Sequence, residues 1–254
     1  MNPEKIFSLT DKTAIVTGAS KGIGLAIAQL YAHYGANVVV SSRKQEAVDE
    51  VAKELTDKGL KATGIACHMG DGDQITQLVD RTVETYGGVD IIVNNAAVNP
   101  IFGGIEESND DAFDKIMNVN VRGPLQLCKV AFPHLRKNGG SVINISSIEG
   151  ITPGQGLGLY SVSKSALIQL TKVLAREWGT HHIRANVICP GLVKTKFSEA
   201  LTSNDKILKL VMMKQALPTV AEPEDMAGLA LFLASDASAF CTGASYIADG
   251  GYTI

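Results

Sequence analysis

The sequence lacks the features that mark several classes of protein. Its formal net charge is only −3, so it has no basic surplus of the kind typical of nucleic-acid-binding surfaces. Apolar runs stay well short of the roughly 20 residues that a membrane helix needs. Residues 1–11 lack the long apolar core of a signal peptide, and residues 250–254 are not a Ser-Lys-Leu peroxisomal signal. We therefore expect no nucleic-acid or membrane partner and a cytoplasmic location.

Residues that form disulfides or bind metals are also few. The four cysteines lie far apart and show no metal-ligand spacing, so we expect reduced, mostly buried thiols. His181 and His182 are adjacent. If they lay on a strand, their side chains would point to opposite faces and could not share a metal ion. We expect no metal site.

The sequence does contain enough apolar residues for a packed domain. Of its 254 residues, 45% are hydrophobic and 19% are charged, and no low-complexity linker divides the chain. Short β-branched runs alternate with longer helical patterns, which predicts a doubly wound α/β sheet with helices on both faces. We expect a single domain over residues 1–254, with its ligand beyond the carboxyl ends of the strands. The predicted strands are 13–17, 37–41, 62–66, 91–94, 142–145, 185–188 and 245–248.

A glycine-rich turn joins the first predicted strand to a helix. Glycines stand at positions 18, 22 and 24, where they would let the backbone approach a pyrophosphate held at the helix N-terminus. This spacing departs from the commonest dinucleotide fingerprint, and such a turn can also be purely structural. Gly35 is a stop signal for the helix. The helix is predicted from apolar residues spaced three or four apart: Ile23, Ile27, Leu30 and Tyr34.

The end of the second predicted strand indicates which cofactor would bind. NAD-binding chains usually carry an acid there that accepts hydrogen bonds from the adenosine ribose. This chain instead has Ser42, followed by Arg43 and Lys44. A guanidinium can bind a ribose 2′-phosphate through two hydrogen bonds, and Lys21 in the glycine turn would add a second cation. We predict NADP(H); the alternative is that Arg43 and Lys44 only begin a solvated helix.

Tyr160 and Lys164 form a possible catalytic pair. They are four residues apart in a helical pattern and so lie on one helix face. An ammonium about 4 Å from a phenol would lower the phenol's pKa by roughly three units at an effective dielectric constant of 20. Tyr160 could then exchange a proton with a carbonyl or alcohol oxygen. Without further context, however, this spacing favours a surface pair.

Two serines supply that context. Ser146 and Ser147 follow the predicted strand 142–145, at the edge of the sheet where ligands bind. A hydroxyl there can donate a hydrogen bond to the substrate oxygen and stabilise the charge that develops on it. The alternative is a pair of turn or helix-capping serines.

Together the motifs resemble the short-chain dehydrogenase/reductase family over nearly the whole chain. Each motif is modestly specific, but their conjunction, with Ser147 thirteen positions before Tyr160, is highly specific. The resemblance implies a Rossmann-type sheet of about seven strands in the order 3-2-1-4-5-6-7. The shared landmarks are Thr17-Gly-x-x-x-Gly-x-Gly24, Asn94-Asn95-Ala96-Ala97, Asn120, Ser147, Tyr160-x-x-x-Lys164 and Pro190-Gly191.

The resemblance also implies a role for each site residue. Tyr160 would be the general acid in reduction and the base in oxidation, while Ser147 would position the substrate carbonyl. Lys164 would lower the pKa of Tyr160 and hold the nicotinamide ribose hydroxyls. Asn120 would bend its helix and anchor a water that passes protons to Lys164; the alternative is a polar residue on a solvated helix face. The cofactor-binding residues would be Gly18, Ser20, Lys21, Gly22, Ile23, Gly24, Ser42, Arg43, His68, Met69, Asn95, Ala96, Ala97, Tyr160, Lys164, Pro190, Gly191, Val193 and Thr195.

The chain departs from the family pattern in three places. Ala97 replaces a common glycine, and its methyl group could crowd the cofactor slightly. His68 and Met69 stand where an Asp-Val pair often holds the adenine, so His68 would stack on or hydrogen-bond the base instead. The third departure is Ser42, at the position that favours NADP(H).

We expect about residues 196–218 to form a substrate-binding lid. Its apolar side chains suit a hydrophobic carbonyl compound, although helical packing or a subunit contact would also explain them. The NADP-dependent dicarbonyl and retinal reductase branch is similar to this chain in three segments: Ser41-Ser42-Arg43-Lys44, Cys67-His68-Met69-Gly70 and Ala96-Ala97-Val98-Asn99-Pro100. This similarity implies a carbonyl reductase for α-dicarbonyls, aromatic ketones or retinoid-like compounds. The apolar lid residues are Phe197, Leu201, Ile207, Leu208, Leu210, Val211, Met212 and Met213.

Other functions share these motifs. A 3-oxoacyl-[acyl-carrier-protein] reductase is the main alternative, and a sugar-acid dehydrogenase suits the apolar lid less well. A non-catalytic NADP-binding scaffold is the alternative outside enzymes. The resemblance further implies a homotetramer built on about residues 110–137, 161–178 and 244–249.

Overall fold

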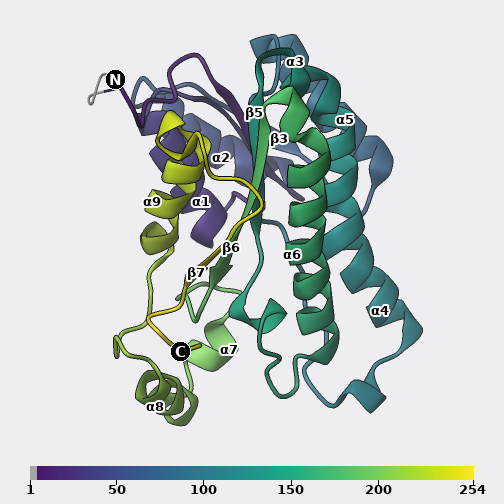
Figure 1. The fold of residues 1–254 in the computed structure, drawn as a ribbon, viewed down its shortest axis with the longest axis vertical. Helices are drawn as coiled ribbons and strands as arrows, with labels where there is room; N and C mark the ends of the chain where they lie inside the picture. The colour runs from purple at the N-terminus through teal and green to yellow at the C-terminus, as the bar shows by residue number, and fades with distance from the viewer. Residues whose placement is uncertain (1–4) are drawn as a thin grey trace.

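Seven parallel strands form one Rossmann-like sheet at the centre of the protein (Figure 1). The computed structural model describes residues 5–254 apart from the side chains of Ala200 and Ile207, so the predicted lid side chain of Ile207 lies outside the described residues. The strand order is β3-β2-β1-β4-β5-β6-β7, as predicted. The strands are β1 (Thr13–Thr17), β2 (Asn37–Ser42), β3 (Ala62–Ala66), β4 (Ile91–Asn94), β5 (Gly140–Ile145), β6 (Ile183–Pro190) and β7 (Ser245–Ala248).

Helices cover both faces of this sheet. Helices α1, α2 and α9 lie on one side of the strands in Figure 1, and α3, α5 and α6 lie on the other. The short helices α7 and α8 lie beyond the end of the sheet at which the β6 arrow terminates. The helices are α1 (Gly22–His33), α2 (Gln45–Thr56), α3 (Gly72–Tyr86), α4 (Asp110–Met117), α5 (Gly123–Asn138), α6 (Gly158–Trp178), α7 (Glu199–Thr202), α8 (Asp205–Lys214) and α9 (Pro223–Ala234).

Burial of both faces explains why the strands read as nearly continuous apolar runs. All five residues of β1 are buried. Ala14 and Val16 pack into the core beneath α1 and α9, whereas Ile15 packs into the core on the α3 and α5 side. A sheet covered on both faces therefore needs apolar residues at consecutive positions, unlike a sheet with one solvated face.

The predicted strands agree with the structure, with differences at some ends. Strands β1, β3, β4 and β7 have the predicted bounds, while β2, β5 and β6 are longer. Pairing of β5 with β6 begins at Gly140 and Ile183, and β6 continues to Pro190; backbone hydrogen bonding extends these strands beyond the apolar pattern. The predicted stop of α1 is also confirmed, because Gly35 adopts a φ of 95° just after the helix.

Three smaller expectations can be compared with the structure. Cys67, Cys128 and Cys189 are buried and Cys241 is partly buried, all as free thiols. The adjacent histidines are not on a strand, because they lie at the end of the 3-10 turn Gly179–His181 and at the residue after it. Within residues 5–254, no helix has both the length and the apolar composition needed to cross a bilayer.

Candidate active site

The turn between β1 and α1 has the backbone that a phosphate-binding loop needs. Gly18 and Gly22 have φ values of 64° and 59°, in the left-handed region that favours glycine. A Cβ on Gly18 would lie 2.8 Å from Nδ2 of Asn95, and a Cβ on Gly24 would lie 2.6 Å from the carbonyl oxygen of Gly18. Conformation and close packing therefore both require glycine here.

Thr17 and Asn95 fasten this turn to the end of β4. The Thr17 hydroxyl donates to the carbonyl of Val93 (3.1 Å) and accepts from the amides of Asn95 (3.0 Å) and Ala96 (3.1 Å). The Asn95 side chain donates to the carbonyls of Thr17 (2.9 Å) and Gly18 (3.1 Å). Five polar contacts thus hold the glycine turn in one position.

The residues at this turn fit a dinucleotide pyrophosphate. Helix α1 begins directly after Lys21, whose side chain makes no capping hydrogen bond to the described residues. The amides of the first helical turn and the positive end of the helix dipole therefore suit an anion. A Cβ on Gly22 would lie 3.2 Å from Cγ2 of Thr195, so the segment after β6 approaches the same end of α1.

The end of β2 lies beside the glycine turn. The amide of Ala19 donates to the carbonyl of Ser41 at 3.0 Å, which brings the segments carrying Lys21 and Arg43 next to each other. Both of these side chains are exposed, and neither forms an ion pair within the described part of the chain. With Ser42 at the strand end in place of an acid, this corner carries two unpaired cations.

The residues after β3 differ in how they can contribute. Nδ1 of His68 accepts a hydrogen bond from the amide of Gly70 at 3.1 Å, and the His68 amide donates to Gln74 at 2.9 Å. The imidazole is therefore oriented by its own loop. The Met69 side chain is 4% exposed and belongs to the core on the α3 side. Its predicted contact with a cofactor can therefore involve only its main chain.

Tyr160, Lys164 and Ser147 come together at the carboxyl end of β5. A hydrogen bond joins the side chains of Ser147 and Tyr160. The Lys164 Nζ lies 5.5 Å from the centre of the Tyr160 ring and donates a hydrogen bond to the carbonyl of Ile145 at 2.8 Å. Tyr160 is 8% exposed and Lys164 is 2% exposed, so the alternative of a surface pair is wrong.

The two serines also have structural roles. Ser147 caps the 3-10 turn Ile148–Gly150 by accepting a hydrogen bond from the Glu149 amide at 3.1 Å. The Ser146 hydroxyl donates to the carbonyl of Lys164 at 2.9 Å and so fixes α6 to the end of β5. Ser147 therefore combines the capping role that its position suggested with a contact to Tyr160.

Burial governs the ionisation of the Tyr160–Lys164 pair. It raises the pKa of Tyr160 above its ordinary value; the hydrogen bond with Ser147 opposes this effect and the Glu149 carboxylate reinforces it. Burial also lowers the pKa of Lys164 to about 8. The pattern predicted a lowered pKa for Tyr160. In the structure the ammonium lies over the ring and bonds to the Ile145 carbonyl, so desolvation dominates and Tyr160 is held as a protonated phenol.

Asn120 lies in a local distortion between α4 and α5. Residues Asn118–Arg122 form a π-helical turn, which confirms the predicted bend. Asn120 is 1% exposed, so the alternative of a solvated helix face is wrong. Its side chain accepts from the Val98 amide (2.8 Å) and donates to the Val98 carbonyl (3.0 Å) and the Ser163 hydroxyl (3.0 Å). Asn120 thereby fixes the segment after β4 to α6; the proton-carrying water stays a prediction.

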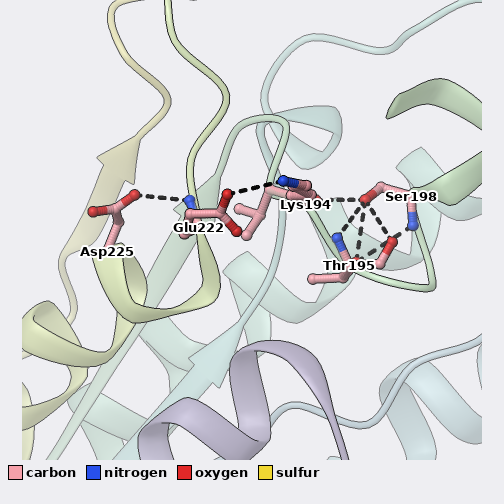
Figure 2. A network of polar contacts seen from close by, with 6 residues as sticks. Lys194, Thr195, Ser198, Glu222 and Asp225 are labelled. Atoms are coloured by element: carbon pink, nitrogen blue, oxygen red, sulfur yellow. Dashed lines mark hydrogen bonds and ion pairs between the residues drawn. The ribbon is translucent and has the colours of Figure 1, made fainter. Parts of the chain in front are cut away.

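A polar network holds the segment that follows β6, as Figure 2 shows. Lys194 forms an ion pair with Glu222 at 3.3 Å, which ties this segment to the start of α9. The Ser198 hydroxyl donates to the Val193 carbonyl and accepts from the Thr195 amide at 3.1 Å. The backbone that carries Val193 and Thr195, both predicted to lie near the nicotinamide, is therefore held on both sides.

Comparison with known proteins agrees with this geometry. A family model described as "Enoyl-(Acyl carrier protein) reductase" matches residues 18–253. The human protein named "Dehydrogenase/reductase SDR family member 4" is 43% identical over 246 residues, covering 96% of this chain and 88% of that protein. The chain belongs to the short-chain dehydrogenase/reductase family.

Solved structures of this family have the same fold. A dehydrogenase/reductase from Sinorhizobium meliloti is 38% identical, with a TM-score of 0.92 and 98% of each chain covered. A gluconate 5-dehydrogenase from Burkholderia cenocepacia, solved in complex with NADP and tartrate, is 28% identical, with a TM-score of 0.94 and 98% of each chain covered. NAD(P) use by this short-chain dehydrogenase/reductase is thus supported, and so is its membership of the oxidoreductases.

The predicted cofactor residues of this short-chain dehydrogenase/reductase share one edge of the sheet. They lie in the β1–α1 turn and the first turn of α1, at or just after the carboxyl ends of β2, β3, β4 and β6, and at the start of α6. Ala97 is partly buried in the segment after β4. A Cβ on Gly191 would lie 2.8 Å from Cα of Asp249, so this glycine is needed for close contact with the end of β7. Ser20 lies in the β1–α1 turn, Ile23 in the first turn of α1 and Pro190 at the end of β6.

The segment between β6 and α9 carries α7 and α8 and lies beside Tyr160. Phe197 precedes α7, and its ring centroid lies 5.8 Å from that of Tyr160. Leu210, Met213 and Leu217 are 62%, 82% and 64% exposed. This short-chain dehydrogenase/reductase therefore has one apolar ring beside Tyr160 and further exposed apolar side chains on α8 and just after it.

Two features of the site were not predicted from the sequence. Thr17 was a landmark of the turn, but its hydroxyl also joins β1 to β4. Glu149 was overlooked, although its main chain contacts Ser147 and its carboxylate acts on Tyr160. The available signal was that Glu149 is the only acid between the serine and tyrosine motifs.

Proposed function

We propose that this protein is an NADPH-dependent carbonyl reductase that interconverts ketones or aldehydes and alcohols. The observation that carries the proposal is the geometry at the carboxyl end of β5, where the buried Tyr160 phenol lies beside Ser147 and the Lys164 Nζ lies 5.5 Å from the centre of the Tyr160 ring. A phenol held in its protonated form is suited to donate a proton to a carbonyl oxygen.

Each residue of the site has a defined task in this proposal. The bound cofactor supplies the hydride. Tyr160 gives its proton to the substrate oxygen, and the Ser147 hydroxyl hydrogen-bonds the same oxygen as negative charge develops there. Lys164 holds the nicotinamide ribose hydroxyls and fixes the position of the Tyr160 ring. Asn120 positions the segment after β4 against α6 and anchors the proton-carrying water.

The two unpaired cations support NADP(H) over NAD(H). Lys21 and Arg43 lie on neighbouring segments joined by the hydrogen bond between Ala19 and Ser41. A 2′-phosphate placed between them would gain charge-assisted hydrogen bonds, whereas an acid at Ser42 would repel it. The described residues offer no carboxylate partner that competes for either cation.

The apolar surface of the lid, residues 196–218, supports a hydrophobic carbonyl substrate. Phe197 lies against Tyr160, and Leu210 and Met213 are exposed, so a flat or aromatic compound would find apolar partners. α-Dicarbonyls, aromatic ketones and retinoid-like aldehydes fit this surface. A relative from Erythroxylum coca, 41% identical over 94% of this chain and 92% of its own length, is named "Tropinone reductase-like 3".

Oxidation of NADPH and NADH across a carbonyl panel tests the proposal. The panel contains diacetyl-type diketones, isatin, retinal, aromatic ketones and a 3-oxoacyl thioester. We expect turnover of diketones or aromatic ketones with strong preference for NADPH. Turnover of the thioester alone would indicate a 3-oxoacyl-[acyl-carrier-protein] reductase. Reduction of NADP⁺ by gluconate, measured in a separate assay, with no turnover of the panel would indicate a sugar-acid dehydrogenase. A preference for NADH would overturn the cofactor assignment.

A Tyr160→Phe variant separates an enzyme from an NADP-binding scaffold. The substitution removes the proton donor but keeps the ring against Phe197. We expect turnover to fall by about 10²–10⁴-fold, the range for loss of a general acid, with NADPH binding unchanged by fluorescence titration. Unchanged behaviour of the two proteins, with NADPH bound by both and carbonyl turned over by neither, would support the scaffold.

We also propose a cytoplasmic homotetramer. The predicted contact helices and strand carry exposed apolar side chains: Val162 and Val173 on α6 are 50% and 39% exposed, and Ile247 on β7 is 48% exposed. Burying these groups between subunits would be favourable. A monomer in light scattering would refute the tetramer.

A further inference from the structure

Glu149 connects three parts of the candidate active site. Its amide donates to the Ser147 hydroxyl at 3.1 Å. Its carboxylate accepts hydrogen bonds from the Gly154 amide at 2.5 Å and from the Ser161 hydroxyl at 3.3 Å. Ser161 follows Tyr160 directly in α6, so the main chain and side chain of one residue together join the serine motif, the loop 150–157 and the start of α6.

The loop held by Glu149 borders the substrate side of the site. The Gly103 amide donates to the Gly156 carbonyl at 3.1 Å, which pairs this loop with the segment after β4. A Cβ on Gly156 would lie 3.2 Å from the Phe102 ring, and a Cβ on Gly158 would lie 2.9 Å from Cδ1 of Ile105. Glu149 therefore anchors a two-loop wall that ends at Tyr160.

The charge on this wall has one sign. Segments 98–109 and 148–158 contain Glu106, Glu107 and Glu149 but no lysine, arginine or histidine. Two cations approach the site from other elements. Lys164 lies beneath the Tyr160 ring and donates to the Ile145 carbonyl, and Lys196 is exposed on the lid. An anionic substrate beside Tyr160 would thus face a carboxylate within the wall.

We propose that Glu149 determines substrate specificity by positioning the loop 150–157 and by placing a negative charge beside Tyr160 that disfavours substrates bearing a carboxylate. This inference rests on the proposed function and narrows it to neutral carbonyl compounds. Because the carboxylate is fastened by two donors, it cannot swing away from an approaching anion without losing both hydrogen bonds. Sugar acids and 2-oxo acids are therefore poor substrates.

A matched ester and acid test the charge. Methyl benzoylformate and benzoylformate share the same ketone and ring; the ester is neutral and carries an added methyl group, whereas the acid carries a negative charge. In Glu149→Gln, which keeps an acceptor oxygen, we expect kcat/KM for the acid to rise roughly five- to tenfold, as for unit charges several ångströms apart in a partly solvated site. The ester should change less than about twofold. Glu84→Gln removes a charge from the exposed end of α3 and should leave both substrates unchanged.

Two further measurements separate charge from loop anchoring. Raising the ionic strength should increase turnover of the acid in the wild-type protein but not in Glu149→Gln, because salt screens the repulsion. Glu149→Asp keeps the charge with a shorter reach, so it should retain discrimination against the acid even where loop anchoring is lost. An equal loss on ester and acid in Glu149→Gln, or an unchanged ratio, would overturn the specificity role.

Binding to the protein–NADP⁺ complex, where reduction is impossible, tests the inference independently of turnover. Calorimetry with benzoylformate and its methyl ester should show the acid binding more weakly in the wild type, and the difference should shrink in Glu149→Gln. If the wild type reduces neither compound while this binding difference holds, the proposed function fails and the role of Glu149 stands. If neither compound binds, or both bind equally in the two proteins, the role of Glu149 is wrong.

Discussion

The ammonium of Lys164 lies 5.5 Å from the centre of the Tyr160 ring and donates a hydrogen bond to the Ile145 carbonyl at 2.8 Å. The lysine is thus attached to the carboxyl end of β5 rather than to the phenol oxygen. Ser146 reinforces this attachment by donating to the Lys164 carbonyl. These contacts hold α6 against the carboxyl end of β5, and they thereby fix the position of Tyr160 on α6.

Burial of Lys164 predicts a pH-dependent stability. Its folded-state pKa, about 8, is below the ordinary value of about 10.4. Below pH 8 the folded protein bears the full cost of a buried charge; between the two values the unfolded chain binds more protons, so stability rises with pH. We expect cofactor-free Lys164→Met to be more stable than the wild type at pH 6.5 by up to about 3 kcal/mol, a difference that shrinks by pH 9.5.

Urea unfolding at several pH values measures this difference. Tyr160 is present in both proteins, so its own titration largely cancels. Lys58→Met, at an exposed position, should show no such trend. A stability difference between Lys164→Met and the wild type that stays constant from pH 6.5 to 9.5 would contradict the buried-charge explanation.

Arg43→Ala should weaken NADPH binding selectively. Loss of hydrogen bonds to a charged group costs about 1.5–3 kcal/mol, so the Kd for NADPH should rise roughly 10- to 100-fold while the Kd for NADH changes little. Fluorescence titration with both cofactors measures the effect, and Lys58→Ala is the control for a lost surface charge. An equal rise in the Kd for NADPH and for NADH would show that Arg43 does not bind the 2′-phosphate.

The sequence predicted the parts of this site that depend on strand order and glycine conformation. Apolar runs predicted the strands, and a parallel sheet brings their carboxyl ends to one edge, so Ser147 and the glycine turn had to lie at the same edge of the sheet. The pattern could not reveal that burial would raise the pKa of Tyr160, because desolvation depends on all surrounding elements. The pattern also could not reveal that the Met69 side chain is buried, because that depends on its packing in the core on the α3 side of the sheet.

Gly18→Ala tests the close approach of the phosphate-binding turn. Gly18 and Gly59 both have positive φ, 64° and 77°, so alanine at either position costs roughly 1–2 kcal/mol of backbone strain. Only Gly18 also has a neighbour, Nδ2 of Asn95 at 2.8 Å from a built Cβ, whereas Gly59 has nothing within 4 Å. We expect Gly18→Ala to lose NADPH binding at least tenfold, and Gly59→Ala to lose stability alone.

Thermal unfolding and NADPH titration of both variants separate the two effects. Both substitutions cost a similar backbone strain. Any additional loss of NADPH affinity in Gly18→Ala therefore reports the displacement of Asn95, whose side-chain amide donates to the carbonyls of Thr17 and Gly18. Unchanged NADPH affinity in Gly18→Ala would show that the turn does not contact the cofactor closely.

Phe197 should decide how well bulky aromatic substrates bind. Its ring centroid lies 5.8 Å from that of Tyr160, and 55% of the residue is exposed, so it is available to a ligand at little cost to folding. An aromatic contact contributes about 0.5–1.5 kcal/mol beyond area burial, so Phe197→Ala should raise KM for an aromatic ketone roughly five- to twentyfold. A small diketone, which has no ring and buries less apolar area against Phe197, should change much less. Phe240→Ala removes a fully exposed ring after α9 and should affect neither substrate. Equal increases in KM for the ketone and the diketone would show that Phe197 supports Tyr160 rather than contacting the substrate.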